Sequence, residues 1–142
     1  MPIRKANATW KGNLVDGTGS INTESGALTN TAYNFVSRFE TGIQTNPEEL
    51  LGAAHSACYS MALAASLSGA GFTVNSVVTE DKVHIQKLDA GWTVTKIELS
   101  TVADVTGIDD AAFQKIAADT KAGCPIARAL NVKEVVLTAK LK

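Results

Sequence analysis

The chain has 142 residues, of which 45% are hydrophobic and 19% are charged, so it holds enough apolar material for one folded domain and is not a disordered chain. The net charge of −1 and the 6% of aromatic residues provide no surface suited to nucleic acid or to an anionic membrane. Two cysteines are too few for a disulfide-rich secreted scaffold. We expect no signal peptide, because no apolar run follows the first five residues, and therefore a reducing, cytoplasmic setting.

Residues 1–45 carry the pattern of short strands joined by turns. The segment 3–10 alternates roughly between apolar and polar side chains, and 31–40 alternates again. Gly17-Thr18-Gly19 lacks the spacing of a dinucleotide-binding loop, so a hairpin turn is the better interpretation. Arg38 is expected at the end of a strand, just before the loop that leads into the next element.

The clearest local signal is Asn46-Pro47-Glu48-Glu49. Asn46 is a good N-cap, Pro47 suits the first helical position, and Glu49 at the third position predicts a capping box. A helix is therefore predicted from this motif to about Ser68, where Gly69 and the residues after it end it.

This helix is apolar enough to raise the question of a membrane span. No Asp, Glu, Lys or Arg occurs from Leu50 to Thr79, and twenty such residues are long enough to cross a bilayer. Its first twenty residues, Leu50 to Gly69, also contain His55, several serines and two glycines, and no Lys or Arg lies close to either end of them. We therefore expect no membrane span, but a central helix that is buried on nearly all sides.

Two rows of small side chains run along this helix at a spacing of four residues, and such rows let another helix backbone approach closely. The rows consist of Gly52, Ser56, Ser60, Ala64 and Ser68, and of Ala54, Cys58, Ala62 and Ser66. A chain of this size has few elements to cover the helix, which predicts a homodimer with this helix near the interface. The alternative is a helix wrapped by its own sheet.

The second half of the chain is predicted to form a long hairpin, two helices and a last strand. Residues 72–105 predict a long hairpin with a turn at 89–91 and a β-bulge near Thr95-Lys96, where the alternation changes parity. Asp109 or Asp110 caps a second helix that ends at Gly123, a short third helix follows, and 135–141 alternates as a last strand. The order of strands, helix, strands, helices and strand predicts an α+β fold in one domain over residues 1–142.

The two cysteines are the first candidates for chemistry. Cys58 lies in the middle of the central helix, where burial would raise its pKa, and Cys124 lies at a helix N-terminus, where the dipole would lower its pKa. The residues alone allow two interpretations. The thiols are unrelated buried groups, or they form a redox pair in which one attacks and the other resolves.

Other side chains offer weaker candidates. His55 and Cys58 share one helix face and Cys124 is a conceivable third ligand, but the spacing matches no zinc pattern, so no metal is predicted. An i, i+3 histidine seldom points its ring at the thiol, so His55 is interpreted as a residue that fills space. Arg38 is placed to pair with Glu48; the alternatives are an ordinary charge at a strand edge and compensation of the helix dipole.

Several motifs together resemble the osmotically inducible protein C family, OsmC. They are Ala8-Thr9-Trp10-Lys11-Gly12, Ser20 to Gly26, Arg38-Phe39-Glu40, Thr45 to His55, Ala57-Cys58-Tyr59-Ser60-Met61-Ala62-Leu63 and Lys121-Ala122-Gly123-Cys124-Pro125. The resemblance runs from about residue 3 to residue 141 without large gaps. The sister branch of organic hydroperoxide resistance proteins shares the two cysteines, but the context of Arg38 is similar to OsmC proper.

The resemblance implies an OsmC-like α+β fold in which antiparallel sheets wrap around a long central helix, in an intertwined homodimer with two active sites at its interface. It implies a cytoplasmic thiol peroxidase that reduces hydroperoxides, organic ones preferred, without cofactor or metal and with an external dithiol as reductant. By motif, Cys58 is the peroxidatic cysteine, Cys124 is the resolving cysteine, and Arg38 and Glu48 hold the thiolate. Whether Arg38 serves its own chain or the partner's is left open.

Two other function classes remain at this point. One is a non-enzymatic module that binds an apolar small molecule and whose thiols are structural. The other is a general disulfide reductase. Consumption of an organic hydroperoxide distinguishes the peroxidase from both.

Overall fold

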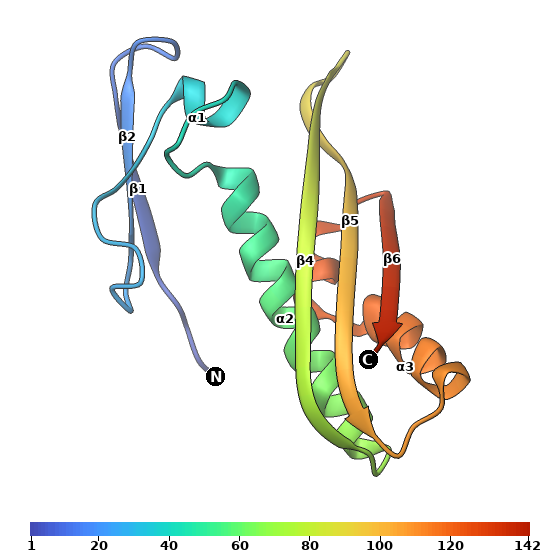
Figure 1. Ribbon diagram of the computed structural model, residues 1–142. Coiled ribbons are helices and arrows are strands. Elements are labelled where there is room, and N and C mark those ends of the chain that lie inside the picture. Colours follow the sequence, from blue (N-terminus) through green and yellow to red (C-terminus); the bar gives the residue numbers. More distant parts are fainter. The chain divides into compact units, whose positions relative to one another are not determined.

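The computed structural model describes residues 1–142, which fall into two compact units, Met1–Leu50 and Leu51–Lys142 (Figure 1). The elements are β1 (Ala6–Lys11), β2 (Thr18–Thr23), β3 (Thr31–Tyr33), α1 (Phe35–Phe39), α2 (Pro47–Gly69), β4 (Thr73–Leu88), β5 (Gly91–Thr106), α3 (Asp110–Gly123), α4 (Pro125–Leu130) and β6 (Glu134–Leu141). This order confirms the α+β class. Helix α2 begins in the first unit and continues into the second, and the single domain stays a prediction.

The first unit contains an antiparallel sheet in the order β1-β2-β3. The turn around Gly17 joins β1 to β2, as expected of a hairpin. The strand predicted over 31–40 is wrong beyond Tyr33, because α1 begins two residues later. Asn34 caps this helix in a capping box: its Oδ1 accepts from the Ser37 N–H, and Ser37 Oγ accepts from the Asn34 N–H. This local capping outweighs the alternating pattern and places Arg38 on a helix rather than at a strand end.

Helix α2 starts and ends where the sequence predicts. Asn46 Oδ1 accepts from the Glu49 N–H at 2.8 Å, and Pro47 is the first helical residue. The Glu49 carboxylate accepts from Thr45 Oγ1 at 3.5 Å instead of turning back to Asn46, so one half of the predicted capping box forms. The last residue is Gly69, one beyond the predicted end.

Helix α2 is long and apolar enough to cross a membrane by length and composition, but only 28% of its most apolar window is buried. The expectation that it is buried on nearly all sides is therefore wrong for the single chain. In the two small-residue rows, Ala54, Ser66 and Ser68 are exposed in the single chain, whereas Gly52 is buried and the other members are partly buried, so part of this surface is open to a second copy.

The second unit contains a mixed sheet in the order β4-β5-β6. Strands β4 and β5 form the predicted antiparallel hairpin, and its register shifts where His84 pairs with Lys96 but Ile85 pairs with Val94, so Thr95 is the extra residue of the predicted bulge. Strand β6 runs parallel to β5, which corrects the expectation of antiparallel sheets. The chain leaves β5 through α3 and α4, and a helical crossover of this kind returns it in the same direction.

The core of the second unit lies between this sheet and the helices α2 and α3. Its fully buried members are Tyr59, Leu63, Leu67, Leu99, Ala103, Phe113 and Ala117. Burial of each large apolar side chain contributes about 1.5–3 kcal/mol. Asp109 caps α3 by accepting from the Ala112 N–H at 2.8 Å, and β6 alternates as predicted, with Val135 to Leu141 contributing every second residue to the core.

Tyr59 connects α2 to α3 inside this core. Its side chain is fully buried, and its hydroxyl donates to the Ala117 carbonyl at 3.0 Å. Burial raises the pKa of Tyr59 to about 12, because a phenolate in an apolar environment loses its hydration. The folded protein therefore keeps this proton at a pH where the unfolded chain, with an ordinary tyrosine pKa of about 10, releases it.

We predict that Tyr59 makes the protein less stable between about pH 10 and pH 12. In that window the unfolded state binds fewer protons than the folded state, so the free energy of unfolding falls by about 2–3 kcal/mol, whereas below pH 10 this contribution is fully present. Urea denaturation of wild type and Tyr59→Phe at pH 8 and pH 11.5 measures it. The difference in the free energy of unfolding between wild type and Tyr59→Phe should change by about 2–3 kcal/mol between the two pH values. An identical pH dependence of the two proteins would contradict the prediction.

Candidate active site

The two cysteines meet, although 66 residues separate them. Cys58 lies on α2 and Cys124 is the residue between α3 and α4, and their sulfur atoms are 2.7 Å apart as free thiols. The Cys124 side chain is fully buried and Cys58 is partly exposed. A disulfide bond is roughly 2.05 Å long, so little movement separates this contact from a covalent bond.

The surroundings of Cys124 oppose its ionisation. The pKa of Cys124 is raised, first because the side chain is buried and then because its S–H donates to the Cys58 sulfur. The backbone N–H groups of Ala127 and Ile126 act in the opposite direction with smaller effect. The N-terminus of α4 therefore acts in the expected direction, but the expectation of a lowered pKa for Cys124 is wrong overall, because burial outweighs the effect of this six-residue helix.

The predicted pair of Arg38 and Glu48 forms within the first unit. Arg38 Nη2 lies 2.9 Å from Glu48 Oε1, and Arg38 Nε lies 3.3 Å from each carboxylate oxygen. The guanidinium also stacks over the Phe39 ring, with Cζ 5.1 Å from the ring centre. Glu48 is 11% exposed and Arg38 is 36% exposed, so these contacts fix the orientation of a cation that remains partly accessible.

A buried hydrogen bond between a histidine and an aspartate lies one helical turn before Cys58. His55 Nδ1 is 2.5 Å from Asp81 Oδ2, and both side chains are fully buried. His55 Nε2 and Asp81 Oδ1 have no partner in the chain. The interpretation of His55 as a residue that only fills space is therefore wrong. The missed signal is Asp81 itself, a carboxylate that shares strand parity with the apolar Val83 and Ile85.

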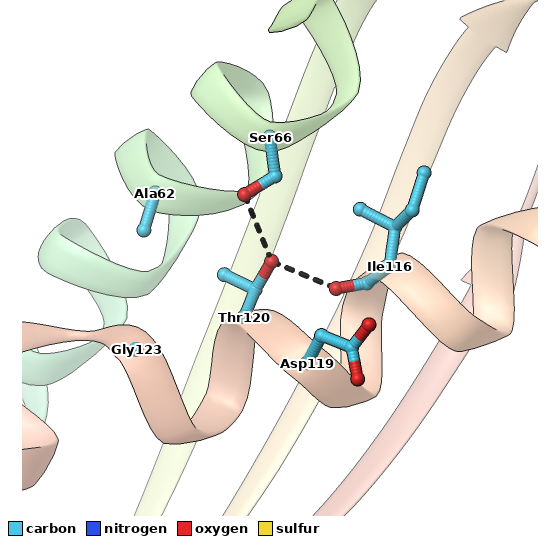
Figure 2. A pocket seen from close by; sticks show the side chains of 6 residues that line it. All are labelled: Ala62, Ser66, Ile116, Asp119, Thr120 and Gly123. Carbon is cyan, nitrogen blue, oxygen red and sulfur yellow. Dashed lines mark hydrogen bonds between the residues drawn. The ribbon is translucent and has the colours of Figure 1, made fainter. Parts of the chain in front are cut away.

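A pocket of about 330 Å³ lies between α2 and α3 on the side of the cysteines (Figure 2). It is lined by Ala62, Ser66, Ile116, Asp119, Thr120 and Gly123. Ala62 is one turn after Cys58, and Gly123 directly precedes Cys124. Thr120 hydrogen-bonds to Ser66 across the pocket at 3.3 Å. Two hydroxyls and a carboxylate lie among the side chains that line this pocket. No group of three or more His, Cys, Asp or Glu side chains is placed to hold a metal ion.

Comparisons with known proteins agree with this architecture. The sequence pattern of the OsmC family, described as OsmC-like protein, matches residues 40–140. The Escherichia coli (strain K12) protein named Peroxiredoxin OsmC is 46% identical over 139 residues, which cover 98% of this chain and 96% of that protein. The Shigella flexneri protein of the same name matches equally well.

Solved structures share the fold. An organic hydroperoxide resistance protein from Elizabethkingia anophelis is 22% identical with a TM-score of 0.73, and the match covers 99% of both chains. An OsmC-like protein of unknown function from Vibrio cholerae is 19% identical with a TM-score of 0.75, covering 98% of this chain and 99% of that chain. Fold and site thus define an α+β protein with two thiols within bonding reach. The chain belongs to the OsmC-like protein family.

The buried pair of His55 and Asp81 leads to a stability prediction. Asp81→Ala leaves the buried histidine nitrogen without its hydrogen-bond partner, and leaving a buried polar group unsatisfied in this way costs about 1–3 kcal/mol. Asp81→Asn, which keeps an acceptor oxygen, should cost less. Urea denaturation gives both values, and Asp89→Ala at the exposed β4–β5 turn is the matched control, expected to change the free energy of unfolding by less than about 0.5 kcal/mol. A cost as small for Asp81→Ala would contradict the prediction.

Proposed function

We propose that this protein is a thiol-dependent peroxidase that reduces hydroperoxides, with organic hydroperoxides preferred, to the corresponding alcohols. The observation that carries the proposal is the contact of the Cys58 and Cys124 sulfurs at 2.7 Å. Thiols that are only structural have no need to meet, so the contact favours a redox pair over a non-enzymatic binding module. The relatives named Peroxiredoxin OsmC support the same assignment.

The reaction begins at Cys58. Its thiolate attacks one peroxide oxygen, the O–O bond breaks, and the leaving oxygen takes a proton, which gives Cys58 sulfenic acid and an alcohol. The Cys124 thiol then attacks the Cys58 sulfur and the hydroxyl leaves as water, forming a disulfide. An external dithiol reduces this disulfide and is itself oxidised, so that two electrons pass from the dithiol to the hydroperoxide in each cycle.

The order of the two cysteines follows from their surroundings. Cys124 is fully buried and its raised pKa keeps it protonated, whereas Cys58 is partly exposed and accepts the hydrogen bond from Cys124. A donor at this position stabilises a negative charge on Cys58. Cys58 is therefore the peroxidatic cysteine and Cys124 the resolving cysteine.

Arg38 is the cation proposed to complete the site, with Glu48 holding its guanidinium in place. Glu48 and Cys58 lie ten residues apart on α2, which is about 15 Å of helix. This length favours a site in which Arg38 and Glu48 of one subunit serve Cys58 of the other. The exposed members of the small-residue rows of α2, Ala54, Ser66 and Ser68, supply part of the surface for a homodimer of this kind.

The remaining features of the proposal follow from the chain's composition and site. The protein is soluble and works in the cytoplasm, where thiols stay reduced. No metal or organic cofactor takes part, since sulfur carries both electrons of each cycle. Neither nucleic acid nor a membrane is a partner; the partners are the hydroperoxide, the dithiol and a second copy of the chain.

The proposed reaction predicts different oxidation products for the wild-type protein and the two cysteine variants. One equivalent of cumene hydroperoxide should remove two mass units from the wild-type protein, because the disulfide contains two hydrogen atoms fewer than the thiols. Cys124→Ser should gain one oxygen on Cys58 and lose dithiol-driven turnover, and Cys58→Ser should lose both. Intact-protein mass spectrometry distinguishes these products, and full turnover by Cys58→Ser would end the proposal.

The proposed role of Arg38 predicts a slower reaction when its charge is removed. Arg38→Ala should slow oxidation of Cys58 at pH 7 by about tenfold or more, because a nearby cation lowers the pKa of an acidic group by about 1–3 units. The difference in rate between Arg38→Ala and wild type should become smaller as the pH rises. Stopped-flow rates from pH 6 to pH 10 measure it, and Arg4→Ala, which removes an exposed arginine, is the matched control.

Mixing of subunits tests which chain Arg38 serves. Equal amounts of Arg38→Ala and Cys58→Ser protein, unfolded and refolded together, form mixed dimers. If Arg38 acts across the interface, each mixed dimer contains one intact site, and about a quarter of wild-type activity returns. If Arg38 acts within its own chain, no activity returns above the level of the separate variants.

A further inference from the structure

A pocket of about 490 Å³ lies in the second unit, beside the turn of the β4–β5 hairpin. The start of α2 supplies Leu51 to its wall, the end of α4 supplies Leu130, and residues on both sides of the hairpin turn complete it. Leu51 precedes Cys58 by seven residues and Leu130 follows Cys124 by six, which is about 9–11 Å of helix in each case. Neither cysteine lines the pocket, so it is separate from the sulfur centre.

The β-bulge in β5 shapes one wall of this pocket. Successive side chains of a regular strand face opposite sides, yet Thr93, Val94 and Thr95 all line the pocket. Thr95 is the extra residue of the bulge, since the register with β4 shifts there. A bulge bends its strand and redirects its side chains, which explains how three successive residues reach the same pocket.

A left-handed residue shapes the opposite wall. Asn131 ends α4 with φ 47° and ψ 40°, and the chain turns there, so that Leu130, Asn131, Val132 and Lys133 line the pocket in succession. Asparagine is one of the few residues other than glycine that adopt this conformation readily. Backbone irregularities of this kind cluster at ligand-binding positions, and here two of them, on different elements, form walls of one pocket.

The pocket is largely apolar although it is open to water. Leu88 and Trp92, one on each side of the hairpin turn, are 47% and 52% exposed, and Leu51, Val94 and Leu130 add further apolar surface. Small-molecule pockets typically have volumes of about 300–1,000 Å³ and apolar walls with a few polar groups. This pocket therefore has the size and the character to bury the apolar part of a small molecule.

Lys133 is the one charged residue that lines the pocket. It takes part in none of the ion pairs of the chain. The adjacent acid, Glu134, lies opposite Lys96 on the neighbouring strand, and no Asp or Glu lines the pocket. A negative group on a ligand would therefore meet a cation without a competing internal partner.

We propose that this pocket binds a small organic carboxylate, with its apolar part against Leu88, Trp92 and Leu130 and its carboxylate at Lys133. The apolar part gains from leaving water, and the carboxylate gives Lys133 the partner that it lacks. A neutral molecule loses the second contribution, and a cation would be repelled. The inference does not rest on the proposed function, because neither sulfur nor the Arg38 guanidinium is part of the pocket.

Isothermal titration calorimetry of the wild-type protein with decanoate, kept below its micelle-forming concentration, tests the inference without any hydroperoxide. Decanoate should bind in a saturable way. Decan-1-ol, which keeps the apolar part and lacks the charge, should bind about fivefold more weakly, and decyltrimethylammonium more weakly still. Butyrate, which has six methylene groups fewer, should bind more than about 100-fold more weakly. Absence of decanoate binding overturns the inference, and so does equal affinity for the acid, the alcohol and the cation.

Substitutions locate the binding. Lys133→Gln should weaken decanoate binding about fivefold and leave decan-1-ol binding unchanged, whereas Lys140→Gln, on β6 and outside the pocket, should change neither. Leu88→Ala should weaken both ligands about fivefold, and its matched control is Val78→Ala, 67% exposed on the same strand and outside the pocket. Unchanged decanoate affinity in Lys133→Gln and Leu88→Ala overturns the inference.

A second copy of the chain is the other occupant that the experiment distinguishes. If two copies met at this pocket, wild-type protein would bind no decanoate and Leu88→Asp would lower the mass measured by light scattering, which overturns the inference. Loss of decanoate binding by Leu88→Asp at an unchanged mass supports it. Cys58→Ser should bind decanoate like wild type, so failure of the proposed peroxidase reaction would leave this result unaffected.

Discussion

The contact between α2 and α3 determines where the two sulfur atoms lie. Tyr59, the residue after Cys58, is buried in this contact and hydrogen-bonds to Ala117 on α3, and Ser66 joins Thr120 one helical turn before Cys124. The core and the cysteine centre are therefore one packing arrangement. A substitution that moves α3 relative to α2 moves Cys124 relative to Cys58, so the 2.7 Å contact depends on the same side chains that stabilise the second unit.

Burial also distinguishes the two cysteines, since Cys124 is fully buried and Cys58 is partly exposed. A fully buried thiol stays protonated because the thiolate would lose its hydration, and a protonated thiol is a hydrogen-bond donor. Cys124 in this state donates to Cys58, so the cost of burying one sulfur helps to stabilise a charge on the other. The short dipole of α4 acts in the opposite direction and is weaker, which is why its position at a helix N-terminus is a poor guide to the reactivity of Cys124.

Local signals were sufficient for much of the fold. The bounds of α2 follow from Asn46 and Gly69, and the bulge at Thr95 follows from a change of parity within one strand. Features that depend on distant residues could not be predicted. The direction of β6 depends on how α3 and α4 return the chain, and the pairing of His55 with Asp81 joins residues 26 positions apart. The alternation over 31–40 failed for another reason, because a capping box at Asn34 competes with a strand of the same composition.

In the candidate site, too, contacts between neighbouring elements could be predicted and contacts that depend on strand register could not. The pairing of Arg38 with Glu48 could be predicted from charge and position alone, because the two elements that carry them are neighbours along the chain. The contact between the Trp10 and Tyr33 rings could not be predicted, since it depends on a register that places Gly19 between these two residues. The glycine that was interpreted as part of a turn is instead required by the two rings that meet over it.

In the proposed site, the charge of the sulfur changes during each cycle, and Glu48 gives the Arg38 guanidinium a partner that does not change. A cation placed beside a thiolate loses its partner when the sulfur becomes a sulfenic acid or a disulfide, because both are neutral at sulfur. A partly desolvated charge without a partner is costly, and an unpaired guanidinium would turn away toward water. Arg38 contacts both Glu48 and Phe39 without any sulfur between them. In the proposed cycle these contacts would hold the guanidinium in position when the sulfur is neutral.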